Sequence, residues 1–113
     1  MIAAEELFAL FDMLGTEYYR QGSAPEILPD HFFTFWEIEQ KDFTNFDNKR
    51  NGRVSHFGIC YYDVDIRRTY TEPERLVDAL DKNNWIVESL PKDMPTDEEG
   101  FYGRYLRVAR ITE

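Results

Sequence analysis

The chain has few of the features that mark a membrane, secreted or disulfide-bonded protein. No window approaches the apolar run of about 18 residues that can cross a bilayer. The first residues, Met-Ile-Ala-Ala-Glu-Glu, lack the basic start and apolar centre of a signal peptide. The single cysteine, Cys60, excludes an internal disulfide and predicts a buried, reduced thiol. We therefore expect a protein of the cytoplasm that contacts no membrane.

Basic residues are also scarce. Thirteen Lys and Arg stand against 22 Asp and Glu, which gives a net charge of −9. This excludes a general nucleic-acid binder, because phosphate contacts need clustered Lys and Arg. The bases are concentrated, however: residues 31–70 hold six of them with six acids, and the flanking regions hold nearly all the surplus acid. Such a distribution suits self-association between unlike patches.

Hydrophobic and aromatic residues are plentiful. They make up 42% and 16% of the chain, enough for a folded core, so the charged residues are assigned to the surface. A length of 113 residues without a shift in composition fits one domain, residues 1–113.

The first half of the chain predicts one helix followed by two strands. Apolar residues recur every three or four positions through residues 3–19, which indicates an amphipathic helix. Prolines 25 and 29 make residues 23–29 an extended connection. Residues 31–39 and 53–66 are rich in aromatic and β-branched types and are typical of strands.

The second half predicts a helix and two more strands. Thr71 fits the N-cap of this helix, Pro73 its first turn, and Asn83 or Asn84 its end. Residues 85–90 and 101–112 read as strands around a loop rich in Pro, Asp and Glu. The expected fold is therefore α+β, in the order α-β-β-α-β-β, with two helices packed on a four-stranded, mostly antiparallel sheet. The order of the strands in the sheet stays open.

A long polar loop is expected between the first two strands. Residues 42–52 are too many for a tight hairpin, which suggests a projecting arm that contacts another protein; the alternative is a solvated, flexible connection. Arg67 and Arg68 fit a solvated strand end or a contact with an acidic partner. The candidate interface residues are Lys41, Phe43, Asn45, Phe46, Asp47, Asn48, Lys49, Arg50, Arg53, Arg67 and Arg68.

No combination of residues predicts catalysis, a metal site or a cofactor. Asp63 and Asp65 share a strand face, but further oxygen ligands for Mg²⁺ are missing. His31 and His56 lack the spacing of zinc ligands, and His56 is too far along an extended strand to activate Cys60. There is no Gly-rich phosphate loop and no nucleophile elbow. We therefore expect that this protein is not an enzyme.

The aromatic residues of the two central strands fit a core better than a ligand platform. They nevertheless leave one alternative function open: a monomeric small-ligand or protein-binding module that uses its aromatic sheet face, with a pocket near Trp36 or Trp85. The aromatic residues concerned are Phe32, Phe33, Phe35, Trp36, Phe57 and Tyr61.

The chain resembles the tail-terminator or tail-completion proteins of long-tailed phages and prophages of Gram-positive bacteria. The likeness rests on a short amphipathic helix, Pro29 before an aromatic strand, and the stretch Asn45-Phe46-Asp47-Asn48. Tyr61-Tyr-Asp-Val and Tyr70-Thr follow, then a helix opened by acids and two closing strands.

The resemblance implies a structural protein of the virion. A ring, usually a hexamer, would seat on the head-proximal end of the tail tube, stop polymerisation and provide the head-joining face. Its partners would be further copies of itself, the tail tube protein and the head-tail connector protein, with DNA only as passing cargo. It would occur in the cytoplasm of the bacterial host during assembly and then in the virion tail.

Overall fold

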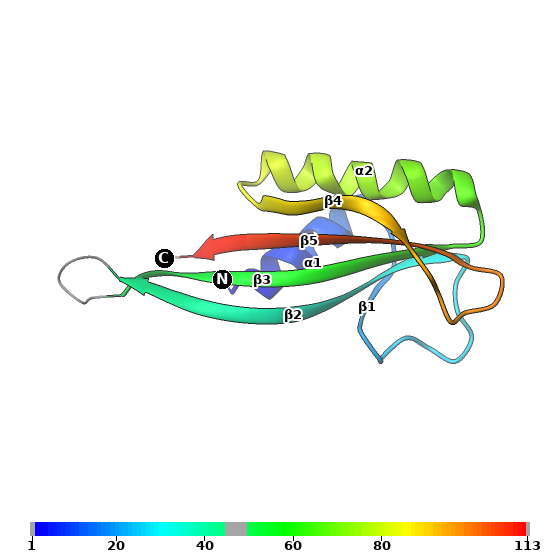
Figure 1. The fold of residues 1–113 in the computed structure, drawn as a ribbon, viewed down its shortest axis with the longest axis horizontal. Helices are drawn as coiled ribbons and strands as arrows, with labels where there is room; N and C mark the ends of the chain where they lie inside the picture. Colours follow the sequence, from blue (N-terminus) through cyan, green and yellow to red (C-terminus); the bar gives the residue numbers. More distant parts are fainter. Residues whose placement is uncertain (1, 45–49, 113) are drawn as a thin grey trace.

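The computed structural model describes residues 2–44 and 50–112 (Figure 1). The elements, in chain order, are α1 (Ala3–Leu14), β1 (Tyr18–Arg20), β2 (His31–Thr44), β3 (Arg50–Asp63), α2 (Ile66–Lys82), β4 (Ile86–Met94) and β5 (Tyr102–Thr112). The strands form one sheet in the order β1-β2-β3-β5-β4. All neighbouring strands are antiparallel except β1 and β2. The α+β class is confirmed, but the prediction of four strands is wrong, because β1 adds a fifth.

The first helix ends at Leu14 and not at residue 19 as the apolar spacing predicts. Gly15 adopts a left-handed conformation with φ 75°, and its N–H donates to the carbonyls of Phe11 and Asp12. Tyr18 then lies in β1, yet its ring stacks on Phe11 with centroids 4.9 Å apart. The spacing therefore identified an aromatic residue that packs against α1, but a left-handed glycine turns the chain before the helix reaches it.

Most of the residues predicted to form a long loop are strand. β2 and β3 stay paired as far as Thr44 and Arg50. We call residues 39–44 and 50–54 the arm; Figure 1 shows its tip projecting beyond the helices, and the molecule measures 53 × 26 × 23 Å. The prediction was wrong because polar side chains here pair across the strands, as Arg53 does with Asp42 at 2.8 Å, without a hydrophobic alternation to signal a strand.

The second helix begins at Ile66, upstream of the predicted N-cap. A carboxylate oxygen of Asp65 accepts the backbone N–H of Arg67 at 2.9 Å and caps α2. Pro73 consequently lies inside the helix. Arg67 and Arg68 belong to the first turn of α2, so their assignment to a strand end was wrong. The predicted end is confirmed: Asn83 is the C-cap, and Asn84 has φ 64°.

The last two strands form where the sequence predicts them, but β4 runs on to Met94 instead of ending at residue 90. It therefore contains Pro91. This proline is tolerated because β4 is an edge strand, where a missing N–H need not cost a ladder hydrogen bond.

Both helices pack on one face of the sheet, and α1 lies behind the strands in Figure 1. This face contributes Phe33, Phe35, Phe57, Ile59, Tyr61, Leu106 and Val108 to the core. No described helix covers the other face, which we call the open face; it carries Trp36, Gly58, Tyr105 and Arg107. None of the described helices is long and apolar enough to span a membrane.

Candidate functional site

The arm carries several of the predicted interface residues. Lys41 and Phe43 lie in β2, and Arg50 and Arg53 in β3, whereas Asn45, Phe46, Asp47, Asn48 and Lys49 lie outside the described residues. The Lys41 ammonium is 3.6 Å from a Glu39 carboxylate, and Arg53 donates to Asp42. These pairs are exposed, so each contributes little to stability and can rearrange when a partner binds.

Arg67 and Arg68 have different environments. Arg68 donates twice to Asp63, from Nε at 2.8 Å and Nη2 at 2.9 Å, whereas Arg67 is exposed. The Asp63 side chain is fully buried and also accepts the Tyr61 hydroxyl at 2.6 Å and the Asp65 N–H at 2.8 Å. We call this cluster the Asp63 junction. It joins the end of β3 to the start of α2, so the Arg68 guanidinium is occupied within its own chain.

The Asp63 junction also fixes protonation states. Burial alone would raise the pKa of Asp63, but the hydrogen bonds from Arg68, Tyr61 and the Asp65 N–H outweigh it and hold that pKa below its ordinary value. Burial, together with the neighbouring Asp63 carboxylate, raises the pKa of Tyr61. Asp63 is therefore a buried anion that Arg68 and the tyrosine hydroxyl stabilise.

Within residues 2–44 and 50–112, no three His, Cys, Asp or Glu side chains gather as a metal site. Asp63 and Asp65 do not act together, because Asp65 caps α2. The Nδ1 of His56 instead lies 2.8 Å from a Glu88 oxygen on the open face, and Arg107 contacts the same carboxylate at 3.2 Å. Burial would raise the pKa of Glu88, but these two partners lower it.

The open face does not present a free aromatic platform around Trp36. Its indole lies across Gly58, where an added Cβ would come within 2.4 Å of the ring, and it stacks on Tyr105 with centroids 5.9 Å apart. The Lys92 ammonium lies 5.7 Å from the centre of the Tyr105 ring. Trp85 is buried in the core against Phe57 and borders a hollow of only about 160 Å³.

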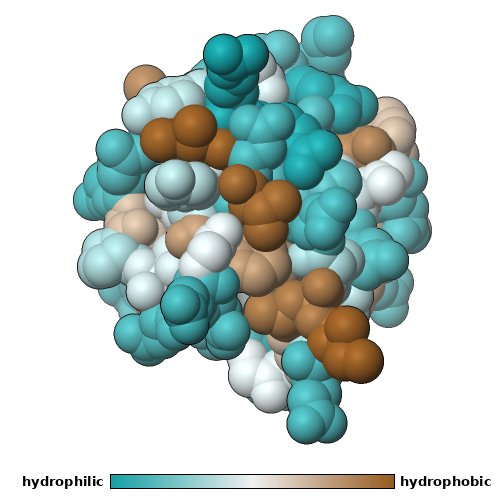
Figure 2. Space-filling model, turned by 90° about the vertical axis from the view of Figure 1, so that its right-hand side faces the viewer, coloured by the Kyte–Doolittle hydropathy of each residue, from teal (hydrophilic) through white to brown (hydrophobic). Residues whose placement is uncertain are grey.

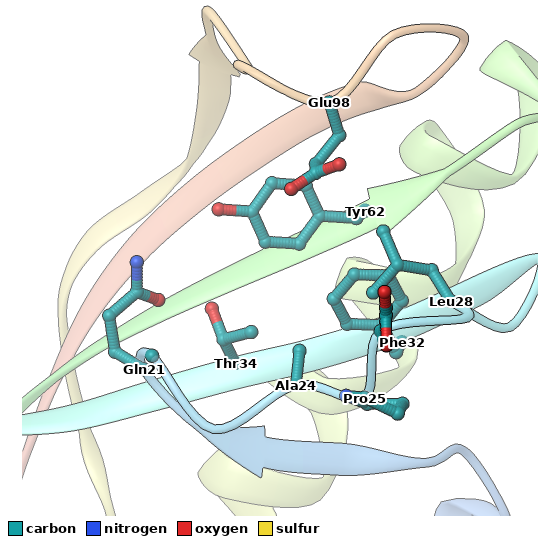
Figure 3. Close-up of a pocket in the computed structure, with 10 residues that line it drawn as sticks. Gln21, Ala24, Pro25, Leu28, Phe32, Thr34, Tyr62 and Glu98 are labelled. Atoms are coloured by element: carbon teal, nitrogen blue, oxygen red, sulfur yellow. The ribbon is translucent and has the colours of Figure 1, made fainter.

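A larger hollow lies at the end of the molecule opposite the arm. Figure 2 views this end directly and shows a diagonal band of hydrophobic side chains across it. We call it the end hollow; its volume is about 360 Å³. Residues 21–28, β2, β3 and the loop before β5 enclose it (Figure 3). Leu28, Phe32 and Tyr62 form apolar walls, and Gln21, Thr34 and Glu98 supply polar atoms.

The Thr34 hydroxyl is the most buried polar group among the residues that line the end hollow. Thr34 is 4% exposed, and its oxygen has no hydrogen-bond partner of good geometry, although the Cys60 thiol and the Tyr62 hydroxyl lie close to it. Burial raises the pKa of both Cys60 and Tyr62, so both groups stay protonated at neutral pH.

No protein-family model matches this chain, and no curated protein matches it in sequence. Its function is therefore inferred from its own surfaces.

Two of these features escaped the sequence-based predictions. The sequence analysis treated Asp63, Asp65 and the Arg67-Arg68 pair as separate motifs. The spacing of five residues between Asp63 and Arg68, at a boundary between a strand and a helix, could have indicated the Asp63 junction. The end hollow has no comparable signal, because Glu98 lies more than 60 residues along the chain from Thr34.

Proposed function

We propose that this chain is a structural subunit of a phage or prophage tail. Several copies, most simply six, form a ring that closes the head-proximal end of the tail tube, stops its polymerisation and provides the face that joins the head-tail connector. The protein performs no turnover. The observation that supports this proposal best is the arm, because it extends the sheet beyond the helices, where a neighbouring subunit could cover it.

The energetics of the arm support assembly. Beyond Arg53, which still pairs with Thr112 of β5, the described part of the arm consists of β2 and β3 alone. A two-stranded ribbon is marginally stable in water, so contact with another subunit would stabilise it. The arm and the end hollow also lie at opposite ends of the molecule (Figure 1). Two unlike patches at opposite ends suit a heterologous interface, the type that generates closed rings.

The charge of the chain is compatible with a ring around DNA. A net charge of −9 gives a lumen lined by this protein a negative or neutral wall, which repels phosphate and lets DNA pass as cargo without sticking. The remaining partners would be the tail tube protein below the ring and the connector protein above it, meeting it in the host cytoplasm during assembly.

Native mass spectrometry over a wide range of protein concentration tests this proposal. We expect a closed ring, and we expect reversal of the three bases in residues 49–53 (Lys49→Glu, Arg50→Glu, Arg53→Glu) to shift it toward monomer while the circular dichroism spectrum is unchanged. The matched control reverses Arg20, Arg75 and Lys82, which gives the same net charge away from the arm.

A chain that is monomeric at every concentration would refute a preformed ring. It would favour the alternative function, a monomeric binding module that uses the open face. Quenching of tryptophan fluorescence by a ligand library, lost in Trp36→Ala, would then support that module.

A further inference from the structure

A second hollow, which we call the end groove, lies beside the end hollow. The first turns of α2 and the loop that joins β4 to β5 line it, and its volume is about 460 Å³. Glu98 borders both the end groove and the end hollow, so the two adjoin at the end of the molecule opposite the arm.

The walls of the end groove are apolar and accessible. Ile66, Tyr70 and Tyr102 line it, and their exposed fractions are 48%, 53% and 48%. Figure 2 shows the band of hydrophobic side chains across this end of the molecule. Large apolar side chains that gather on one surface while half exposed are typical of a binding site for another protein. Contact with apolar side chains of that protein would remove this area from water.

The rim of the end groove is acidic. Residues 93–99 contain four Asp and Glu and no Lys or Arg. The first of these acids, Asp93, lies 2.8 Å from Arg104, whereas the three acids at 97–99 form no ion pair with another described residue. No Lys or Arg is among the described residues that line the end groove. Unpaired carboxylates beside an apolar surface favour an occupant that carries positive charge.

A second copy of this chain fits the end groove poorly. Two copies placed end to end would bring their acidic rims together, and like charges at an interface oppose binding. The described basic side chains of the arm, Lys41 and Arg53, already lie close to Glu39 and Asp42 of their own chain. A different protein is therefore the better source of the positive charge.

We propose that the end groove binds a basic amphipathic segment of a different protein. Apolar side chains of this segment lie on Ile66, Tyr70 and Tyr102, and Lys or Arg next to them faces the acidic rim. This inference goes beyond the ring, because the occupant is not a further copy of this chain. It does not depend on the oligomeric state.

Fluorescence anisotropy with labelled peptides tests the end groove. The probe is the peptide Lys-Lys-Phe-Leu-Lys-Lys with a fluorophore at its N-terminus, and we expect it to bind the wild-type chain. The peptide Glu-Glu-Phe-Leu-Glu-Glu reverses the charge of the probe, and Lys-Lys-Ser-Ser-Lys-Lys removes its apolar side chains. Both should bind at least about tenfold more weakly, because each lacks one of the two features that match the groove.

Ile66→Ser locates the probe on the protein. It removes a half-exposed apolar side chain from the end groove and should weaken binding of the probe at least about fivefold. Ile86→Ser is the matched control, because Ile86 is 46% exposed and lies at the start of β4, outside the lining of the end groove. This control should bind as the wild type does, and circular dichroism checks that both variants are folded.

The outcomes separate the end groove from the ring. A probe that does not bind, that binds no better than the glutamate or serine peptide, or that binds Ile66→Ser as tightly as the wild type overturns this proposal. A ring that is lost in Ile66→Ser would identify the end groove as a contact between subunits and overturn a different protein as its occupant. A wild-type chain that is monomeric but binds the probe as expected refutes the ring and supports the end groove.

Discussion

Replacing Asp63 by Ala should cost more stability than any surface substitution, because it empties the centre of the Asp63 junction. Four hydrogen bonds to a charged acceptor are lost. Arg68 is 39% exposed and can return its donors to water, but the Tyr61 hydroxyl is fully buried and cannot. An unsatisfied buried donor costs about 1–3 kcal/mol, and the loss of the charge-assisted bonds adds to it, so we expect a total of about 3 kcal/mol.

Urea denaturation at pH 7 measures this loss. For a domain of this size, it corresponds to a fall in the melting temperature of about 12 °C. Arg67→Ala is the control, because its side chain is exposed in the same turn of α2, and it should leave stability unchanged. A loss below about 1 kcal/mol in Asp63→Ala would refute the assignment of the junction as a stabilising centre.

The same junction predicts the effect of acid. The pKa of Asp63 is lower in the folded chain than in the unfolded chain, where it is about 3.9. Its contribution is therefore fully present above that unfolded value and is lost as the pH falls through the folded pKa. The stability difference between the wild type and Asp63→Ala should be constant from about pH 5 to 7 and narrow below about pH 4.

Two further substitutions test the packing of the open face and the hydroxyl in the end hollow. Gly58→Ala should cost about 1–3 kcal/mol and shift the tryptophan emission, because the new methyl group displaces the Trp36 ring; unchanged emission would contradict the contact. Thr34→Val should raise the free energy of unfolding by about 1 kcal/mol, because it removes a buried hydroxyl that has no hydrogen bond of good geometry. Urea denaturation measures the effect of Thr34→Val; a destabilised protein would show that Cys60 or Tyr62 already satisfies the hydroxyl.

The sequence predicted the parts of the fold that depend on burial. The aromatic residues Phe33, Phe35, Phe57 and Tyr61 do form the core, and the apolar stripe of α2 is buried from Leu76 to Leu80. These predictions hold because the period of hydrophobic residues follows directly from which face of an element is covered.

The errors occur where long-range contacts decide the structure. The second helix was predicted to begin at Thr71 because a local capping motif is present there. It begins earlier because Asp65, whose N–H is bound by Asp63, caps α2 at Arg67. The short strand β1 (Tyr18–Arg20) is defined by its parallel backbone pairing with the edge of β2, which the local sequence does not predict. The end hollow, likewise, depends on a loop that returns from the far end of the sequence.

The register shift between Glu37 and Glu39 has a consequence for how such a chain can diverge. Phe35 on β2 and Phe57 on β3 are the last members of the hydrophobic core cluster before the arm begins. The bulge then lets the arm pair in a register of its own. The arm can thus lengthen or shorten by paired residues without disturbing the hydrophobic core. Descendants of this chain could therefore bind a different partner through the arm while keeping the same fold.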